Sequence, residues 1–439
     1  TTYYVAQTRN ASDNNPGTKE LPFRTLKKAG DTAEAGDTVI IGGGTYRETL
    51  TPKNSGRADA PIIYQAAEGE EVIVSAFEEL SGFARYNSEL LDNGELYAVK
   101  TDIDMGEDYN FITYKGEPLI QGRYPNVQTA PEPYPWPDDV TSPLWPTKGD
   151  LKIGGKEFMQ DGKIYSPNDL NQEDDYWKGA FFVGMIEEGW TLTHAKIKSS
   201  TQGSITIDRN TIDYWGNIFG KNYGVFPSDY GYITNSIKTL DTSGEWQLEN
   251  GMLYIYPIDG VEPQALTVEV KARMVCINLR DKEYIQMKNI NTTGGGINLT
   301  DSVMCVLNGG IFKYLSHWIY TMDAQSAFHE AYEKYGNAVA WTEHDSTYDR
   351  GEVGICVSGD NNAVINSEID YSAGAGILLY GKHSYVENNV INDTGYGGTY
   401  LAGISISKQG WKPKTLPTGG HYIYNNTINN TGRAAIYIS

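Results

Sequence analysis

The chain has 439 residues and a formal net charge of −21 at pH 7, from 35 basic and 56 acidic side chains. This charge argues against polyanionic partners, so neither nucleic acid nor an anionic membrane surface is expected to bind. No run of about 18 apolar residues is present, so no membrane insertion is predicted. The odd number of cysteines, Cys276, Cys305 and Cys356, predicts buried thiols rather than a disulfide framework.

Residues 1–80 are predicted to form an N-terminal cap and the first coils of a repeating β-structure. Residues 3–6 are expected to form a short strand, and residues 22–34 an amphipathic helix. One side of that helix would carry Phe23, Leu26, Ala29 and Ala33. Such a helix would cover the open end of a stack of strands, which otherwise exposes strand edges and core.

The stretch YYVAQTRNASDNNPGTKELPFRTLKKAGDTAEAGDTVIIGGGTYRE, residues 3–48, resembles the opening of secreted right-handed parallel β-helix enzymes that act on polysaccharides. It is similar to the start of the β-xylosidases of glycoside hydrolase family 120 and of β-helix alginate lyases. The resemblance implies an all-β fold, a carbohydrate substrate and a secreted or cell-surface location in a bacterium. Because it concerns a capping motif, it implies the fold rather than a catalytic site.

Residues 81–268 interrupt the repeat. Their alternating apolar runs and Gly or Asn turns predict an inserted antiparallel β-sandwich. The sequences RYPN (123–126) and LYIYP (253–257) resemble an inserted β-domain of several β-helix glycosidase families. The aromatic, glycine-rich stretch 211–235 is interpreted either as a lid over a glycan cleft or as packing between domains.

Residues 269–439 repeat a pair of short apolar strands with a period of about 20–22 residues, which is typical of parallel β-helix coils. Asn residues placed three positions before a strand anchor predict a ladder of stacked amides, with a simple turn role as the alternative. The predicted anchors are Ile277, Ile297, Ile319, Ile355, Ile377, Ile404 and Ile436 for the first strand, and Ile290, Ile311, Ile369, Ile391 and Ile428 for the second. The ladder residues are Asn308, Asn366, Asn388 and Asn425.

Three excursions from the period, at 321–353, 393–402 and 407–421, are expected to wall a groove across the first-strand sheet. Strand alternation points the residue after each anchor outward, toward this groove. The outward row is Asn298, Tyr320, Cys356, Leu378, Ser405 and Tyr437. The predicted sugar-binding residues are Trp318, Tyr320, Tyr380, Lys382, Lys408 and Trp411.

Carboxylates near these strands supply candidate catalytic groups. Asp323 and Asp360 stand at strand exits expected in adjacent coils, and Glu352 stands just before a strand. Two carboxylates about 5–10 Å apart are what glycoside hydrolysis requires. Each Asp also has a structural alternative, as a turn residue or, for Asp323, as a helix cap. The acidic stretch 341–352 suggests a structural Ca²⁺ as an alternative, but no spacing matches a metal motif, so no cofactor is predicted.

Two other functions stay open. The first is a polysaccharide lyase acting by β-elimination on a uronate: Lys408 and Arg433 resemble in place a Lys and an Arg of β-helix alginate lyases. The sequence departs from that pattern, because Leu401-Ala402-Gly403 replaces an expected acidic residue and no Arg-His-Gly follows. The second is a non-catalytic β-helix that only binds glycans. The preferred prediction is a glycoside hydrolase with a carboxylate pair.

Overall fold

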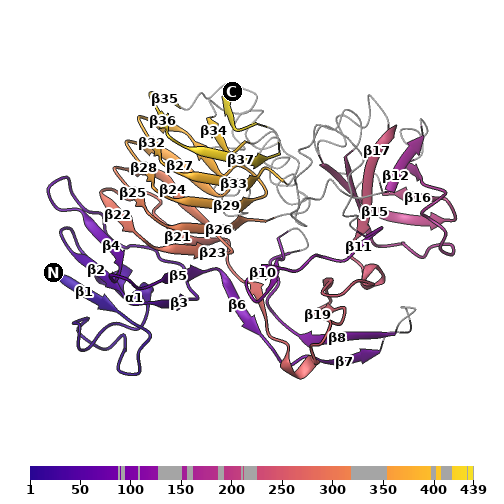
Figure 1. The fold of residues 1–439 in the computed structure, drawn as a ribbon, viewed down its shortest axis with the longest axis horizontal. Helices are drawn as coiled ribbons and strands as arrows, with labels where there is room; N and C mark the ends of the chain where they lie inside the picture. The colour runs from indigo at the N-terminus through magenta and orange to yellow at the C-terminus, as the bar shows by residue number, and fades with distance from the viewer. Residues whose placement is uncertain are drawn as a thin grey trace.

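The computed structural model describes residues 1–87, 89, 94–106, 109–126, 151–155, 162–185, 192–208, 211, 225–317, 353–396, 402–406, 418–432 and 434–438. Within these ranges the chain is a right-handed parallel β-helix with an antiparallel β-insert, which confirms the predicted fold class. The coils stack from the N-terminus to the C-terminus, and the insert lies beside them, joined by two crossing strands (Figure 1). No described helix is long and apolar enough to cross a membrane.

Three parallel sheets form the β-helix, and their inward side chains fill one continuous apolar core. Sheet A contains β1 (Thr2–Val5), β2 (Thr38–Ile41), β4 (Ile62–Ala66), β22 (Ile285–Lys288), β25 (Val306–Asn308), β28 (Ala363–Ile365), β32 (Tyr385–Glu387) and β36 (Tyr422–Tyr424). Sheet B contains β3 (Gly44–Tyr46), β5 (Val72–Ser75), β23 (Asn291–Thr293), β26 (Ile311–Ser316), β29 (Glu368–Ser372), β33 (Val390–Thr394) and β37 (Thr427–Thr431). Sheet C contains β21 (Val275–Asn278), β24 (Gly296–Val303), β27 (Ile355–Asp360), β30 (Ile377–Leu379), β31 (Gly381–Lys382), β34 (Ile404–Ile406), β35 (Thr418–Gly419) and β38 (Ile436–Ile438).

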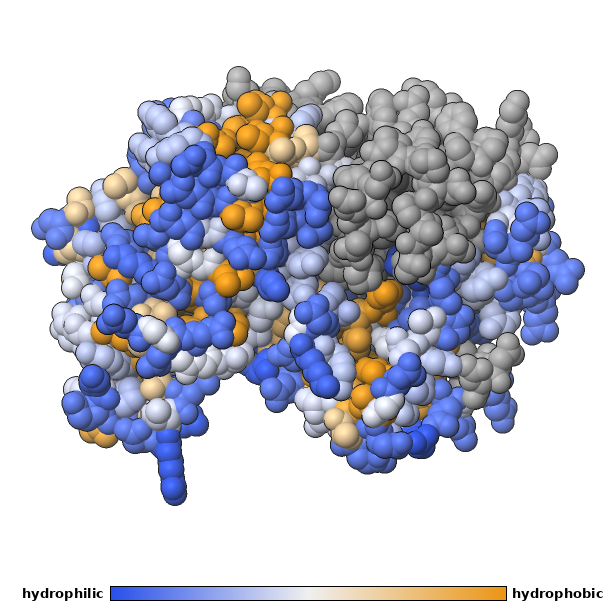
Figure 2. Space-filling view, viewed as in Figure 1, coloured by the Kyte–Doolittle hydropathy of each residue, from blue (hydrophilic) through white to orange (hydrophobic). Residues whose placement is uncertain are grey.

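The N-terminal cap forms as predicted. Helix α1 (Leu26–Thr32) begins after Thr25, whose hydroxyl accepts a hydrogen bond from the Lys28 amide. Phe23, Leu26, Ala29 and Ala33 are all buried in the β-helix core, which confirms the apolar side of the helix. The opposite end shows apolar residues at its surface (Figure 2), where Ile438 of the last strand is 71% exposed.

The predicted asparagine ladder is confirmed at the corner between sheets A and B. Each amide nitrogen donates to the amide oxygen one coil below: Asn366 to Asn308 (2.9 Å), Asn388 to Asn366 (3.3 Å) and Asn425 to Asn388 (2.9 Å). Three of these residues have left-handed backbones (φ 54–59°), a conformation that Asn tolerates better than most residues. The ladder therefore combines a tight turn with coil-to-coil hydrogen bonds.

The predicted first strand at Ile319, with the outward Tyr320 beside it, lies outside the described residues. Among the described strands, β24 pairs directly with β27, with Ile297 opposite Ile355, so these two are neighbours in sheet C. The described outward row of sheet C runs Asn298, Cys356, Leu378, Ser405 and Tyr437. The anchor at Ile311 is displaced: Phe312 takes the inward position opposite Ile369, and Ile311 is exposed. Because Ile311 and Phe312 are both apolar, the sequence alone does not decide which of them faces the core.

The insert is built from antiparallel sheets. Two four-stranded sheets share one apolar core that includes Trp246, Leu253 and Val268. Their strands are β6 (Phe77–Leu80), β20 (Val268–Lys271), β9 (Ile112–Tyr114) and β10 (Glu117–Pro118) in one sheet, and β7 (Ala84–Asn87), β8 (Glu95–Lys100), β19 (Met252–Ile255) and β18 (Trp246–Glu249) in the other. The short 3₁₀ turns η2 (Ile237–Thr239) and η3 (Pro263–Ala265) connect strands of the insert.

A further antiparallel unit has its own core, which includes Ile164, Phe182 and Ile205. Strand β17 pairs with both β12 and β14, so six of the strands close into a ring that the sequence did not predict. The strands are β11 (Arg123–Tyr124), β12 (Leu151–Gly155), β13 (Lys163–Tyr165), β14 (Phe181–Met185), β15 (Leu192–Thr201), β16 (Ser204–Ile207) and β17 (Val225–Thr234).

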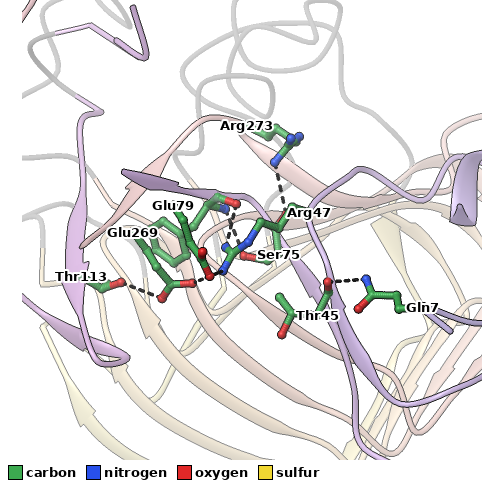
Figure 3. A network of polar contacts seen from close by, with 9 residues as sticks. Gln7, Thr45, Arg47, Ser75, Glu79, Thr113, Glu269 and Arg273 are labelled. Carbon is green, nitrogen blue, oxygen red and sulfur yellow. Dashed lines mark hydrogen bonds and ion pairs between the residues drawn. The ribbon is translucent and has the colours of Figure 1, made fainter. Parts of the chain in front are cut away.

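The insert leaves and rejoins the β-helix through β6 and β20, which pair antiparallel. Arg47, which follows β3 of the β-helix, forms ion pairs with Glu79 of β6 (2.7 Å) and Glu269 of β20 (2.9 Å). It also donates to the Phe77 carbonyl at 3.1 Å, and Thr113 donates to Glu269 (Figure 3). One guanidinium therefore ties both crossing strands to the first coils. The domain boundaries expected from the sequence, at residues 80/81 and 268/269, fall at the end of β6 and near the start of β20.

A carboxylate site at the seam between the β-helix and the insert

The outer face of sheet B carries a polar row where the β-helix meets the insert. Lys313, Asp370, Asn392 and Asn429 are aligned in successive strands β26, β29, β33 and β37. The residues before them, Phe312, Ile369, Ile391 and Ile428, face the core. Because side chains alternate along a strand, the polar row faces outward.

The residue after each row member has a left-handed backbone. These residues are Tyr314 (φ 53°), Tyr371 (φ 62°), Asp393 (φ 51°) and Asn430 (φ 50°). The repeated left-handed residue bends the chain near the end of each sheet B strand, before it continues to sheet C. It also stacks Tyr314 on Tyr371, with ring centroids 5.1 Å apart. We call Tyr314, Tyr371, Asp370, Asp393 and the facing Glu117 of the insert the seam site.

The insert packs directly on this site. Phe111, just before β9, stacks on His317 with centroids 4.3 Å apart and meets Tyr314 edge-on at 5.4 Å. The Tyr314 hydroxyl donates to the Gly116 carbonyl in the β9–β10 hairpin at 3.3 Å. Glu117 follows in β10, and its negative charge helps burial to raise the pKa of Tyr314. The hairpin therefore brings a carboxylate from the insert toward the tyrosine pair.

Asp370 is the buried acid of the seam site. It is 5% exposed, and its Oδ1 accepts a hydrogen bond from Asn392 Nδ2 at 2.8 Å. Burial, with a contribution from the neighbouring Glu368, raises its pKa to about 7 against the opposing effects of Asn392 and Lys313. The Asp370 carboxyl therefore keeps a proton that it can donate near neutral pH.

Asp393 supplies a second carboxylate, one coil along the axis. Burial raises the pKa of the Tyr371 hydroxyl, and the charges of Asp393 and then Asp370 raise it further. The phenol consequently stays protonated and lies within the field of both acids. A tyrosine ring flanked by two carboxyls offers an apolar face for a sugar and acidic groups beside it.

His317 and Lys271 lie behind the seam site and are buried. The Tyr396 hydroxyl donates to the Ser316 carbonyl (3.0 Å), so His317 Nδ1, 3.0 Å from the same hydroxyl oxygen, carries the proton and donates to it. Burial, with help from Lys271, lowers the pKa of His317 to about 3, so its imidazole stays neutral. Within the described ranges Lys271 Nζ has no hydrogen-bond partner, and burial lowers its pKa to about 8.

Three predicted site residues lie in the described structure, away from the seam site. Asp360 ends β27 at the corner between sheets C and A, where its Oδ1 accepts from the Lys382 amide at 3.0 Å. Both Asp360 and Lys382 are exposed. Tyr380 is buried and packs with Cys356 and Leu378 beside sheet C. The six residues of β27 separate Asp360 from the seam corner by about 17 Å.

The other predicted site residues lie outside the described residues. The stretch 341–352, proposed for Ca²⁺, also lies there, and the described ranges contain no group of three or more His, Cys, Asp or Glu side chains fit for a metal. The three cysteines are free and buried, as predicted. The undescribed candidates are Asp323, Glu352, Trp318, Tyr320, Lys408, Trp411 and Arg433.

Sequence reasoning missed Asp370 and Asp393. Asp370 follows Ile369, a predicted inward anchor, and so belongs to the outward row, as does Asn392 after Ile391. That alternation is the signal that could have placed Asp370 beside Asn392. The three excursions from the repeat favour a groove across the first-strand sheet, sheet C, whereas this row lies on sheet B.

Comparison with known proteins supports the fold. A solved structure described as a glycoside hydrolase superposes with a TM-score of 0.61 at 17% identity, covering 97% of this chain and 73% of that one. The uncharacterized protein YwoF of Bacillus subtilis is 46% identical over 88 residues, and pectate lyase PEL9 of Emericella nidulans is 40% identical over 86 residues. These matches span 20% and 19% of this chain, and only 18% and 21% of the relatives' lengths. No family model matches the chain.

Proposed function

We propose that this protein is a glycoside hydrolase that cleaves a polysaccharide or oligosaccharide at the seam site. The observation that carries the proposal is the buried Asp370 carboxyl, which accepts a hydrogen bond from Asn392 and is followed directly in sequence by Tyr371 of the stacked Tyr314–Tyr371 pair. The similarity in fold to a glycoside hydrolase supports the same class of reaction. The partner is a carbohydrate, and no cofactor enters the proposed reaction.

In the proposed reaction, Asp370 gives its proton to the glycosidic oxygen as the bond from that oxygen to the anomeric carbon breaks. Asp393 either attacks the anomeric carbon or removes a proton from the attacking water. Water supplies the hydroxyl of one product, and its remaining proton restores the acid. Tyr371 provides a ring face against which the sugar packs. The stereochemistry of the product distinguishes the two roles of Asp393, since attack by Asp393 leads to retention.

The test compares Asp370→Asn with Asp360→Asn in a panel of nitrophenyl glycosides and oligosaccharides. Asp370→Asn removes the proton donor, so we expect kcat/KM to fall by about 10³-fold for a substrate with a poor leaving group. Asp360→Asn makes the same chemical change at an exposed, distant carboxylate and should leave the rate within about twofold. Full activity in Asp370→Asn would reject the proposal, and loss in Asp360→Asn would favour the carboxylates predicted from sequence, Asp360 with Asp323 and Glu352.

A polysaccharide lyase is the second candidate, because part of the chain is 40% identical to a pectate lyase. Lys408 would remove the proton beside a uronate, and Arg433 would neutralise the carboxylate. Ultraviolet-absorbing unsaturated products appearing together with reducing ends would identify this reaction, whereas hydrolysis yields reducing ends alone. A third outcome, binding without either product, would identify a glycan-binding β-helix. A secreted or cell-surface location in a bacterium belongs to the same proposal.

A further inference from the structure

We propose that Asn392 is a positioning residue that holds the Asp370 carboxyl so that Oδ2 carries the transferable proton, and that Asn429 fixes the orientation of Asn392. This inference rests on the proposed function. It adds Asn392 and Asn429 to the proton donor and the tyrosine pair. The two asparagines form a polar relay that runs from β37 through β33 to the Asp370 carboxyl on β29.

The relay consists of two hydrogen bonds in one direction. Asn429 Nδ2 donates to Asn392 Oδ1 at 3.0 Å, and Asn392 Nδ2 donates to Asp370 Oδ1 at 2.8 Å. The first bond settles which way the Asn392 amide faces, because its oxygen must point toward Asn429. The nitrogen is then turned toward Asp370. The parallel register of β29, β33 and β37 keeps the three side chains in line.

The hydrogen bond acts on one oxygen of the acid. With Oδ1 accepting from an amide N–H, the proton resides on Oδ2, which is the oxygen left to face a substrate. As the proton leaves, negative charge spreads onto Oδ1, where the Asn392 N–H stabilises it. Asn392 therefore makes Asp370 a stronger acid than its burial beside Glu368 would allow, in agreement with the opposing influence of Asn392 on the pKa of Asp370.

Two other charged groups act on Asp370: Glu368, two residues away on the same strand, and Lys313, opposite on β26. Two further carboxylates, Asp393 of β33 and Glu117 of β10, act on the neighbouring tyrosines. None of these groups is altered when Asn392 or Asn429 is replaced. A change in the ionisation of Asp370 in such variants consequently reports the loss of the relay.

The experiment measures the pH dependence of kcat/KM for Asn392→Ala and Asn429→Ala with the best nitrophenyl glycoside of the panel. Loss of the Asn392 hydrogen bond disfavours the charged carboxylate, so the alkaline limb should move up by about one pH unit. Asn429→Ala should move it in the same direction by less. Carbon-13 spectra of protein labelled at the Asp carboxyls, assigned with Asp370→Asn, follow the same ionisation without any substrate.

Asn388→Ala is the matched control, because Asn388 has two ladder hydrogen bonds at the corner between sheets A and B. It should lower stability and leave the alkaline limb in place. An unmoved limb and an unmoved carboxyl titration in Asn392→Ala would overturn the relay, even if Asp370→Asn is inactive. An active Asp370→Asn would instead reject the proposed function, while the carboxyl titration would still decide whether Asn392 orients Asp370.

Discussion

Lys271 lies in an environment that disfavours its charge. Its side chain is fully buried where β20 meets the first coils, and Nζ has no hydrogen-bond partner among the residues that the structure describes. An ammonium group that loses its water without gaining a partner costs free energy. Burial accordingly lowers the pKa of Lys271 from 10.5 to about 8. This residue therefore reduces the stability of the junction.

Replacing Lys271 with Met should stabilise the protein by about 2 kcal/mol at pH 7, because Met keeps the volume and removes the unpaired charge. The gain has a defined pH dependence. Below about pH 8 the amine is charged in both the folded and the unfolded chain, so the cost of burial is fully present. Between about pH 8 and 10.5 the folded amine loses its proton first, the wild-type protein gains stability, and the advantage of Met shrinks.

Denaturant melts at pH 7 and near pH 10 check this prediction, with Lys100→Met as the control. Lys100 ends β8 of the insert and is exposed, so its replacement should change stability by less than about 0.5 kcal/mol at either pH. A destabilised Lys271→Met variant at pH 7 would mean that the ammonium makes a favourable interaction in the folded protein. Equal gains at both pH values would contradict the proposed ionisation of Lys271.

At the scale of elements, the asparagine ladder allows two contributions to stability to be measured separately. One is the hydrogen bonding of the amides, and the other is the strain that a left-handed backbone imposes on residues other than Asn and Gly. Asn388 has a left-handed backbone (φ 56°) and takes part in two amide hydrogen bonds, one with Asn366 and one with Asn425. Asn388→Gly keeps the backbone free to adopt this conformation but loses the amide, and should cost about 1 kcal/mol. Asn388→Ala adds backbone strain and should cost about 2 kcal/mol.

Asn361 provides the matched position for the ladder experiment. It is exposed, has a left-handed backbone (φ 57°), and its side chain forms no hydrogen bond with another described residue. We expect Asn361→Gly to be nearly neutral and Asn361→Ala to cost about 1 kcal/mol, the strain alone. Urea melts of the four variants measure their free energies of unfolding. The difference between Gly and Ala at each position gives the backbone strain, and the difference between the two Gly variants gives the contribution of the ladder amides. If Asn388→Gly is as stable as Asn361→Gly, the ladder amides contribute nothing measurable.

The same elements show what the sequence can predict. The repeat of short strands predicts the coils and the ladder, because stacked coils place equivalent residues in contact at a fixed spacing. It does not predict which strands pair across a long connection, as those of Ile297 and Ile355 do. The ionisation of Asp370 is also beyond a local pattern. It depends on Asn392 in the next coil and on burial, which the sequence does not report.

At the scale of the whole molecule, the insert and the β-helix are joined by an aromatic contact as well as by Arg47. Phe111 of the insert is fully buried and stacks on His317 of the β-helix. Phe111 also packs edge-on against Tyr314, whose hydroxyl donates to the Gly116 carbonyl in the β9–β10 hairpin. The seam site therefore requires both parts of the molecule, since Glu117 comes from the insert and Asp370 from a coil.

Phe111→Ala should uncouple the two parts. Removing a buried aromatic ring costs about 3–4 kcal/mol, and here the cavity lies between the insert and the β-helix rather than inside either core. Hydrogen exchange should accelerate both in the β9–β10 hairpin and in β26, because Tyr314 of β26 and His317 just after it lose their contact with Phe111. Catalytic activity should fall at the same time, because Glu117 and the tyrosine pair are no longer held together.

Phe182→Ala gives the comparison, because Phe182 is equally buried but lies in the separate core of the insert's closed ring of strands. A ring of the same size is removed, so the local cost should be similar. Exchange should then accelerate in β14 and β15, with β26 and the activity unaffected. If both variants accelerate exchange only within the insert, the aromatic contact does not couple the two parts. The seam site would then depend on the Arg47 ion pairs for its geometry, and Arg47→Met would be the variant that releases Glu117 from the tyrosines.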